Sequence, residues 1–285
     1  MNDSVKKGEL LLGTQGFSFD DWVGPFYPDG TPKREYLEVY SKHFRTVEID
    51  STFYGVPRLT TVEGWRKRTP PEFRFAAKFP RAITHEKMLV DAERETETFI
   101  RVMEELEEKL GVLTLQFSYE FESKFFDRLD AYLGSLPPEH RYAVEVRNRD
   151  WMNPEFGLML REHNIGLVLQ DLYYMPRLDW ITADFTVIRW LGRRKDIEVF
   201  DRIQIDRTER LKEWTDRVWL FINEGIDIYG YFNNHFAGHS PASVRQFAEM
   251  IGEPIPWPSE TTADGSAADS AAGGAQLEMD IDKED

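Results

Sequence analysis

Two carboxylates end an apolar stretch in residues 47–57, VEIDSTFYGVP. Glu48 and Asp50 alternate with the β-branched Val47 and Ile49, so a strand here would direct both carboxylates to one face. A pair of aromatic residues and a Gly-Val-Pro turn follow at once. Paired carboxylates at the end of a strand are suited to general acid–base chemistry or to holding a cation.

Similar polar groups end the other strand-like stretches of the chain. In order, these groups are Gln15, Lys78 with His85 shortly after it, Gln116, Glu145 with Arg147, Asp171, Arg189, and Asn233 with Asn234. The opposite ends of the same stretches carry no comparable set. A fold that gathers the carboxyl ends of all its strands would therefore collect these side chains in one place.

The pattern of strands and helices predicts such a fold. The strand-like runs cover 10–14, 46–50, 73–78, 112–117, 142–146, 166–170, 185–190 and 227–232, and the helical stretches cover 32–44, 59–68, 91–110 (with Gly111 as its C-cap), 123–136, 153–164, 209–225 and 240–251. Eight strands in about 250 residues, most of them separated by helices, predict a single-domain α/β protein with a (β/α)₈ barrel, whose active site would lie at the C-terminal ends of the strands. An open doubly wound sheet is the alternative, although no G-x-G-x-x-G or Walker motif supports a nucleotide-binding version.

Composition sets the domain limits and excludes several classes of chemistry. The 285-residue chain has no cysteine, so thiol catalysis and Cys-ligated zinc are excluded. No apolar run is long enough to span a membrane, and the polar start lacks the apolar core of a signal peptide, so we expect a cytoplasmic protein. We expect an N-terminal extension at 1–8, the barrel at 9–258, and a disordered acidic tail at 259–285 that is poor in aromatic residues.

The net charge argues against a nucleic-acid partner. The tail contributes −7 to the total of −16, which leaves −9 for the rest of the chain. General nucleic-acid surfaces are usually basic. We therefore expect a small anionic molecule, rather than nucleic acid or a membrane, as the partner, while the sequence leaves the oligomeric state open.

Several segments resemble the YecE-like family, known as domain of unknown function 72. They are GTQGFSFDDWVGPFYP (13–28), VEIDSTFYGVP (47–57), FRFAAKFPRAITH (73–85), VEVRNRDW (144–151) and YFNNHFAGHSPASVRQF (231–247). The resemblance implies a (β/α)₈ barrel and no assigned activity. Its motif positions fall on Gly16, Trp22, Tyr27, Glu48, Thr52, Phe53, Tyr54, Lys78, Thr84, His85, Glu145, Arg147, Trp151, Asp171, Arg189, Asn233 and Asn234. The chain departs from the pattern at Asp50, where Asn is usual, and at Leu191, where His is common.

The cluster allows three chemical interpretations. The first is a divalent metal, for which the suitable ligands are Asp50, Glu145, Asp171, His85 and His235. However, Lys78, Arg147 and Arg189 would compete for the carboxylates. We therefore predict no cofactor and keep a metal as the less favoured alternative. Alternatively, the charges only neutralise one another as a structural network. The third interpretation, an anionic substrate gripped by arginines and walled by aromatic rings, fits the residue types best.

We therefore predict an enzyme that acts by acid–base chemistry, as a hydrolase or isomerase, on a phosphorylated or acidic sugar-like molecule. The candidate catalytic residues are Glu48, Lys78, His85, Glu145 and Asp171. The candidate substrate-binding residues are Gln15, Trp22, Tyr27, Asp50, Phe53, Tyr54, Gln116, Arg147, Trp151, Arg189, Asn233 and Asn234. A metal-dependent nucleic-acid-processing barrel enzyme and a non-catalytic ligand-binding or scaffold protein remain as alternatives.

Overall fold

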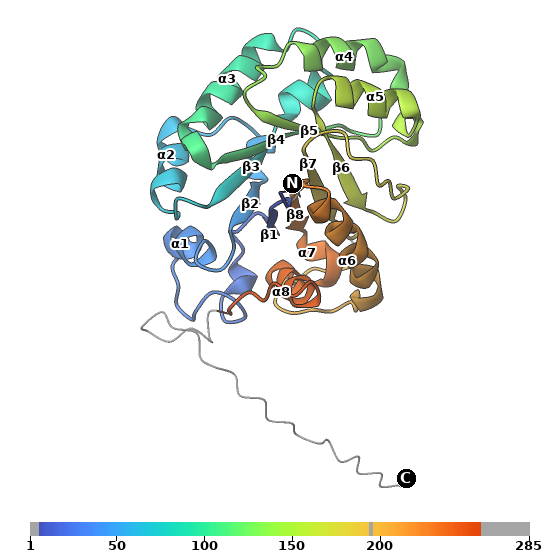
Figure 1. The fold of residues 1–285 in the computed structure, drawn as a ribbon. Coiled ribbons are helices and arrows are strands. Elements are labelled where there is room, and N and C mark those ends of the chain that lie inside the picture. Colours follow the sequence, from blue (N-terminus) through green and yellow to red (C-terminus); the bar gives the residue numbers. More distant parts are fainter. Residues whose placement is uncertain (1–5, 194–195, 258–285) are drawn as a thin grey trace, which may run out of the picture.

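A closed barrel of parallel strands forms the centre of the molecule (Figure 1). The computed structural model describes residues 6–193 and 196–257; residues 1–5 and the predicted acidic tail at 259–285 lie outside this range. Within the described residues the strands pair in chain order and close between the first and the last. The strands are β1 (Leu10–Gln15), β2 (Thr46–Ile49), β3 (Arg74–Lys78), β4 (Leu110–Gln116), β5 (Arg141–Glu145), β6 (Gly166–Asp171), β7 (Phe185–Trp190) and β8 (Asp227–Phe232). The (β/α)₈ prediction is confirmed.

Helices surround the barrel on its outside (Figure 1). They are α1 (Tyr36–Tyr40), α2 (Leu59–Lys67), α3 (Glu93–Met103), α4 (Phe126–Gly134), α5 (Pro154–Glu162), α6 (Thr208–Asn223), α7 (Asn234–Ala237) and α8 (Ser240–Met250). Short helical turns join them: η1 (Asp20–Trp22), η2 (Lys33–Glu35), η3 (Ser51–Phe53), the π-turn η4 (Ala82–Glu86), η5 (Glu104–Lys109), η6 (Ser123–Phe125) and η7 (Arg149–Trp151). None of the described helices is long and apolar enough to cross a membrane.

One predicted helix ends earlier than its sequence pattern indicates. Helix α3 stops at Met103, and the chain continues as η5, in which Glu107 has a φ of 52°. Gly111 is not a helix cap, because it lies inside β4. A Cβ there would stand 3.1 Å from the carbonyl oxygen of Phe75, so the glycine allows β3 and β4 to approach closely.

Successive side chains along each strand face alternately the barrel interior and the surrounding helices, so the protein has two buried apolar regions. A small cluster that includes Leu11, Val112, Val168 and Tyr231 fills the barrel interior, whereas the larger cluster lies between the strands and the helices. Near the C-terminal ends of the strands, the inward-facing positions hold polar residues instead. There, Gln15 pairs in register with Glu48, Gln116 with Glu145, and Gln170 with Arg189. A polar layer therefore lies directly above an apolar barrel core.

Candidate functional site

A cavity of about 770 Å³ opens at the C-terminal ends of the strands. Nine of the predicted site residues line it: Gln15, Asp50, Phe53, Tyr54, Lys78, Gln116, Arg147, Arg189 and Asn233. The strand ends thus bring together side chains that are up to 218 residues apart in the chain. This is the mouth of the barrel, where catalytic sites of this architecture lie, and we call it the mouth cavity.

Arg189 is the central cation of the cavity floor. Its Nη2 lies 3.0 Å from Oε2 of Glu48, and its Nη1 donates to Oε2 of Glu145 and, at 2.8 Å, to Oε1 of Gln116. Both glutamates are fully buried, and Arg189 is nearly so. Because an unpaired buried charge is costly, this arrangement keeps two carboxylates and one guanidinium together beneath the cavity.

The two buried glutamates have opposite pKa shifts. Burial raises the pKa of Glu48 above its usual value, and the nearby Arg189 and Lys78 only partly offset that effect. Burial acts in the same direction on Glu145, but Arg147 and Arg189 outweigh it and lower the pKa of Glu145. The floor therefore contains one carboxyl group that favours its proton and one that favours its charge.

Lys78 connects this floor to the open cavity. Its Nζ donates to Oδ1 of Asp50 and lies 3.9 Å from Oε2 of Glu48. The side chain of Asp50 is 37% exposed, whereas that of Glu48 is fully buried. Of the carboxylates predicted to act at the site, Asp50 is the one that lines the cavity, with Glu48 and Glu145 behind it.

Amide groups with fixed orientations form another part of the wall. Oδ1 of Asn233 accepts the backbone N–H of His235 at the start of α7, so its Nδ2 faces the other way and donates to Oε1 of Gln15 at 2.8 Å. Such amides can hydrogen-bond the hydroxyl or carbonyl groups of a ligand.

Aromatic side chains form the rim. Phe53 and Tyr54 follow β2 as predicted, but Tyr119, Tyr173 and Tyr174 also line the cavity and were not selected from the sequence. Arg193, which the sequence analysis also did not predict, lies over the ring of Tyr173, 4.1 Å from its centroid. The irregular aromatic segment between β6 and β7, DLYYMPRLDWITAD, was the available signal for two of these tyrosines.

His85 lies behind the rim rather than on the cavity wall. Its ring packs edge-on against Phe53 at 4.9 Å, and its Nδ1 is 2.9 Å from Oγ1 of Thr84. Burial and the charge of Arg81 lower the pKa of His85, which favours the neutral ring. Its predicted catalytic role therefore lacks a direct approach to a ligand in the mouth cavity.

Asp171 does not point into the mouth, contrary to our prediction. Asp171 faces outward, on the same side of β6 as Leu167 and Leu169. Its carboxylate accepts hydrogen bonds from Nε1 of Trp214 at 2.7 Å and from Arg210 at 2.5 Å, both on α6. This side chain joins the barrel wall to a helix, which is a structural role.

Four predicted binding residues are likewise buried away from the cavity. Trp22 donates to Oδ1 of Asn234 at 3.3 Å, Tyr27 stacks on Tyr36 at 4.2 Å, and Trp151 donates to the carbonyl of Phe121 at 2.7 Å. All three rings are fully buried, and Asn234 also accepts from Ser240. These residues hold the loops around the mouth in place, but they do not line the cavity.

The mouth contains no candidate metal cluster among the residues that the structure describes. Within that part of the chain, the one group of acidic and histidine side chains close enough to share an ion is Glu104, Glu139 and His140. Glu104 precedes β4 and His140 precedes β5, so this group lies at the opposite end of the barrel from the mouth.

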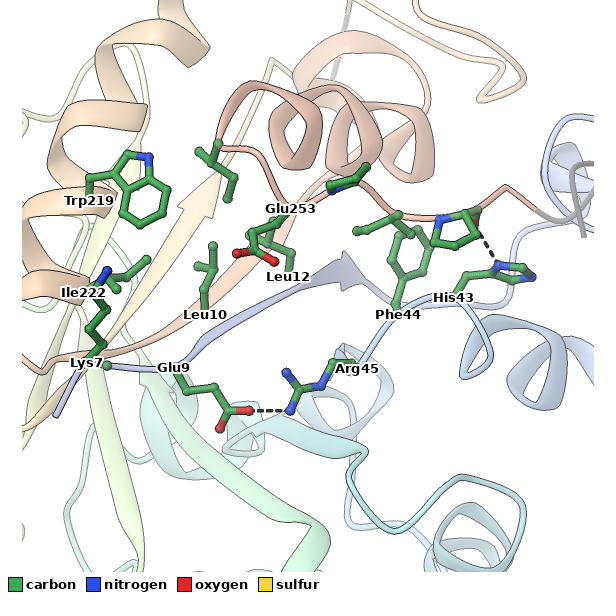
Figure 2. A pocket seen from close by; sticks show the side chains of 15 residues that line it. Lys7, Glu9, Leu10, Leu12, His43, Phe44, Arg45, Trp219, Ile222 and Glu253 are labelled. Carbon is green, nitrogen blue, oxygen red and sulfur yellow. Dashed lines mark hydrogen bonds and ion pairs between the residues drawn. The ribbon is translucent and has the colours of Figure 1, made fainter. Parts of the chain in front are cut away.

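A second cavity of about 500 Å³ lies near the N-terminal ends of β1 and β2 (Figure 2). Its base is apolar, with Leu10, Leu12 and Phe44, and Glu9 pairs with Arg45 at its edge. None of the predicted site residues lines it. In barrels of this type the N-terminal end serves stability rather than catalysis, so the mouth cavity is the better candidate for a functional site.

Sequence comparisons find similarity to proteins of unknown function. The family model described as "Protein of unknown function DUF72" matches residues 11–264. The UPF0759 protein YecE of Escherichia coli K12 is 37% identical over 112 residues, which cover 39% of this chain and only 41% of that protein. The UPF0759 protein YunF of Bacillus subtilis 168 is 25% identical over 274 residues, covering 85% of this chain and 94% of that protein.

Solved structures of related proteins superpose on the barrel. A DUF72 family protein from Thermotoga maritima MSB8 has a TM-score of 0.72 and 29% identity, covering 86% of this chain and all of that one. Another from Enterococcus faecalis V583 has a TM-score of 0.67 and 23% identity, covering 87% and 99% of the two chains, which supports the fold alone.

Proposed function

The chain belongs to the DUF72 family of proteins of unknown function, and we propose that it is an enzyme whose active site is the mouth cavity. It would act by acid–base chemistry, through hydrolysis or isomerisation, on a phosphorylated or acidic sugar-like molecule. One observation carries this proposal: Lys78 links the cavity-lining Asp50 to the buried Glu48.

The Lys78–Asp50 pair supplies a donor and an acceptor at the same point of the cavity wall. In the proposed reaction, the Asp50 carboxylate accepts a proton from the substrate or from an attacking water. The Lys78 ammonium donates a hydrogen bond, and then a proton, to the oxygen on which negative charge develops. Because Glu48 and Glu145 lie behind this pair, we propose Asp50 as the base in place of these glutamates.

Arg147 is the proposed anchor for the anionic group of the substrate. Its Nη2 contacts Oε1 of Glu145, and its side chain also lines the mouth cavity. A guanidinium has five N–H donors in a planar fork, so one edge can hold Glu145 while another binds a carboxylate or phosphate. The floor would thereby fix the anionic group at a set distance from Lys78.

A thermal-shift screen against phosphosugars and sugar acids tests the binding half of this proposal. A ligand specific for the folded state should raise the melting temperature by mass action. The double variant Arg147→Ala, Glu145→Gln removes the anchor together with its buried partner, and should lose the shift. Arg101→Gln, on the exposed surface of α3, is the matched control and should keep it.

Turnover of the ligand found in the screen tests the catalytic half. Lys78→Met and Asp50→Asn should abolish conversion while Arg101→Gln retains it. A ligand that binds through Arg147 but is not converted would show a binding protein rather than an enzyme. Stabilisation by divalent metals alone would contradict the proposal and favour a metal-dependent enzyme.

A further inference from the structure

We infer that the mouth cavity binds a chain of acidic sugar rings rather than one free sugar. This inference rests on the proposed function and specifies its substrate class. One unit of the chain would occupy the polar floor near Asp50, Lys78 and Arg147. Its neighbours would lie against the tyrosines of the rim.

The distribution of exposed tyrosines is the first argument. All 11 tyrosines of the chain lie within the described residues, and only Tyr54, Tyr119 and Tyr173 are exposed there, by 75%, 67% and 64%. All three line the mouth cavity. Exposed aromatic rings that gather at one opening indicate a binding surface, whereas rings exposed without a function would be scattered over the protein.

The positions of these tyrosines give the second argument. Tyr54 follows β2, Tyr119 follows β4 and Tyr173 follows β6, so the three rings come from alternate strands of the closed barrel. They therefore stand on different sides of the opening. A single sugar ring on the floor cannot contact all of them, whereas a chain that leaves the floor across the rim can.

The size of the cavity agrees with a ligand of several rings. Its volume of about 770 Å³ lies in the upper half of the roughly 300–1,000 Å³ range of pockets that enclose drug-sized ligands. A single sugar would leave most of this space to water. The rim aromatics would then make no contact with the ligand.

The amide groups of the mouth cavity suit the hydroxyl groups of sugar rings. Lys78, Arg147, Arg189 and Arg193 are balanced by the lining residues Asp50 and Asp196 and by the buried Glu48 and Glu145. This balance does not separate an acidic sugar chain from a nucleic acid, because each carries a negative group on every unit. Sugar hydroxyls match the amides of Gln15, Gln116 and Asn233.

Calorimetry with sugar chains of one to five units tests the inference. The probes are oligogalacturonates, oligomannuronates and neutral cello-oligosaccharides, with oligodeoxythymidylate as the nucleic-acid comparison. An acidic series should gain about tenfold in affinity with each of the first added rings, since aromatic contacts are of that size. The triple variant Tyr54→Ala, Tyr119→Ala, Tyr173→Ala should bind the trimer no better than wild type binds the monomer. Trp219→Ala, an exposed ring at the other cavity, should bind like wild type.

The outcomes separate this inference from the proposed function. Equal affinity for monomer and trimer, with binding that still needs Arg147, would overturn the inference and leave the proposed function standing. Full retention of trimer binding in the triple tyrosine variant would overturn it as well. Tighter binding of oligodeoxythymidylate than of any sugar chain would assign the rim to nucleic-acid bases instead. Binding of none of the probes would overturn the inference, whereas the proposed function would fall only if the thermal-shift screen against phosphosugars and sugar acids also found no ligand.

Discussion

Arg189 lies 3.0 Å from Glu48 in the buried floor of the barrel mouth, Nη2 to Oε2. The same guanidinium also donates to Glu145, so one cation holds two fully buried carboxylates. The arrangement keeps both carboxylates in defined positions beneath Lys78 and Arg147. The stability of the fold and the geometry of the mouth are therefore coupled through Arg189.

Replacing Arg189 should destabilise the fold. Arg189→Met keeps an apolar stem of similar length but leaves Glu48 and Glu145 without their shared partner, which should cost about 3–5 kcal/mol in the free energy of unfolding. Urea denaturation measures this loss. Arg202→Met removes an exposed ion pair with Asp201 and should change the stability little. Equal stabilities of the two variants would show that the buried network contributes nothing.

The two glutamates should differ in their effect on stability against pH. The pKa of Glu145 is lowered in the folded state, so its stabilising contribution is present above its usual value of 4.5 and is lost as the pH falls below it. The pKa of Glu48 is raised, so its contribution is present below that value and is lost as the pH rises above it. At pH 7, Glu145→Gln should therefore cost more stability than Glu48→Gln. Urea denaturation at pH 4 and pH 7 should show this difference shrinking at the lower pH; a constant difference would contradict the assignment.

The barrel could be predicted from the sequence because each strand has a recognisable local composition. A stretch such as FTVIRW, at 185–190, combines β-branched and aromatic residues, and the structure places β7 on the same residues. The predicted floor residues were found by the same local rule, since a polar group at the end of a buried strand must face a cavity or a partner. Glu48, Lys78 and Arg189 follow this rule.

The errors at the site come from contacts that the local pattern does not contain. Gln170 and Asp171 are adjacent polar residues at the end of β6, and only the parity of the assembled barrel shows that Asp171 faces α6. Trp22 similarly has its partner, Asn234, 212 residues further along the chain. A ring in a loop can pack inward or line a cavity, and the sequence does not distinguish the two.

Asp171→Asn should therefore affect stability rather than ligand binding. The variant weakens the buried pairing with Arg210 and Trp214, and we expect a loss of about 2–4 kcal/mol in the free energy of unfolding. The rise in melting temperature caused by a mouth ligand should stay the same as in wild type. Loss of that rise, without loss of stability, would return Asp171 to the binding site.

Gly192 should not tolerate a side chain, although its backbone conformation is an ordinary one. An added Cβ would stand 1.6 Å from the carbonyl oxygen of His235, which is backbone and cannot simply move aside. Gly192→Ala should lower the stability by about 2 kcal/mol or more and disturb the mouth, where both residues lie. Gly55→Ala, also near the mouth but with no atom within 4 Å of the added Cβ, is the control and should be tolerated. Similar melting temperatures for the two variants would contradict this.

Trp257 should stabilise the C-terminal end of the barrel domain. Its Nε1 donates to the carbonyl of Pro25 at 3.0 Å, and its ring packs on Phe26 at 5.3 Å, so it ties the segment after α8 to the loop after β1. Trp257→Ala should lower the free energy of unfolding by about 2 kcal/mol, because a half-buried ring loses its packing. A chain that ends at residue 258 should melt at the same temperature as the full chain, since the acidic residues beyond it are too polar to form a core. If the shortened chain melted at a lower temperature than the full chain, the predicted boundary at 258 would be wrong.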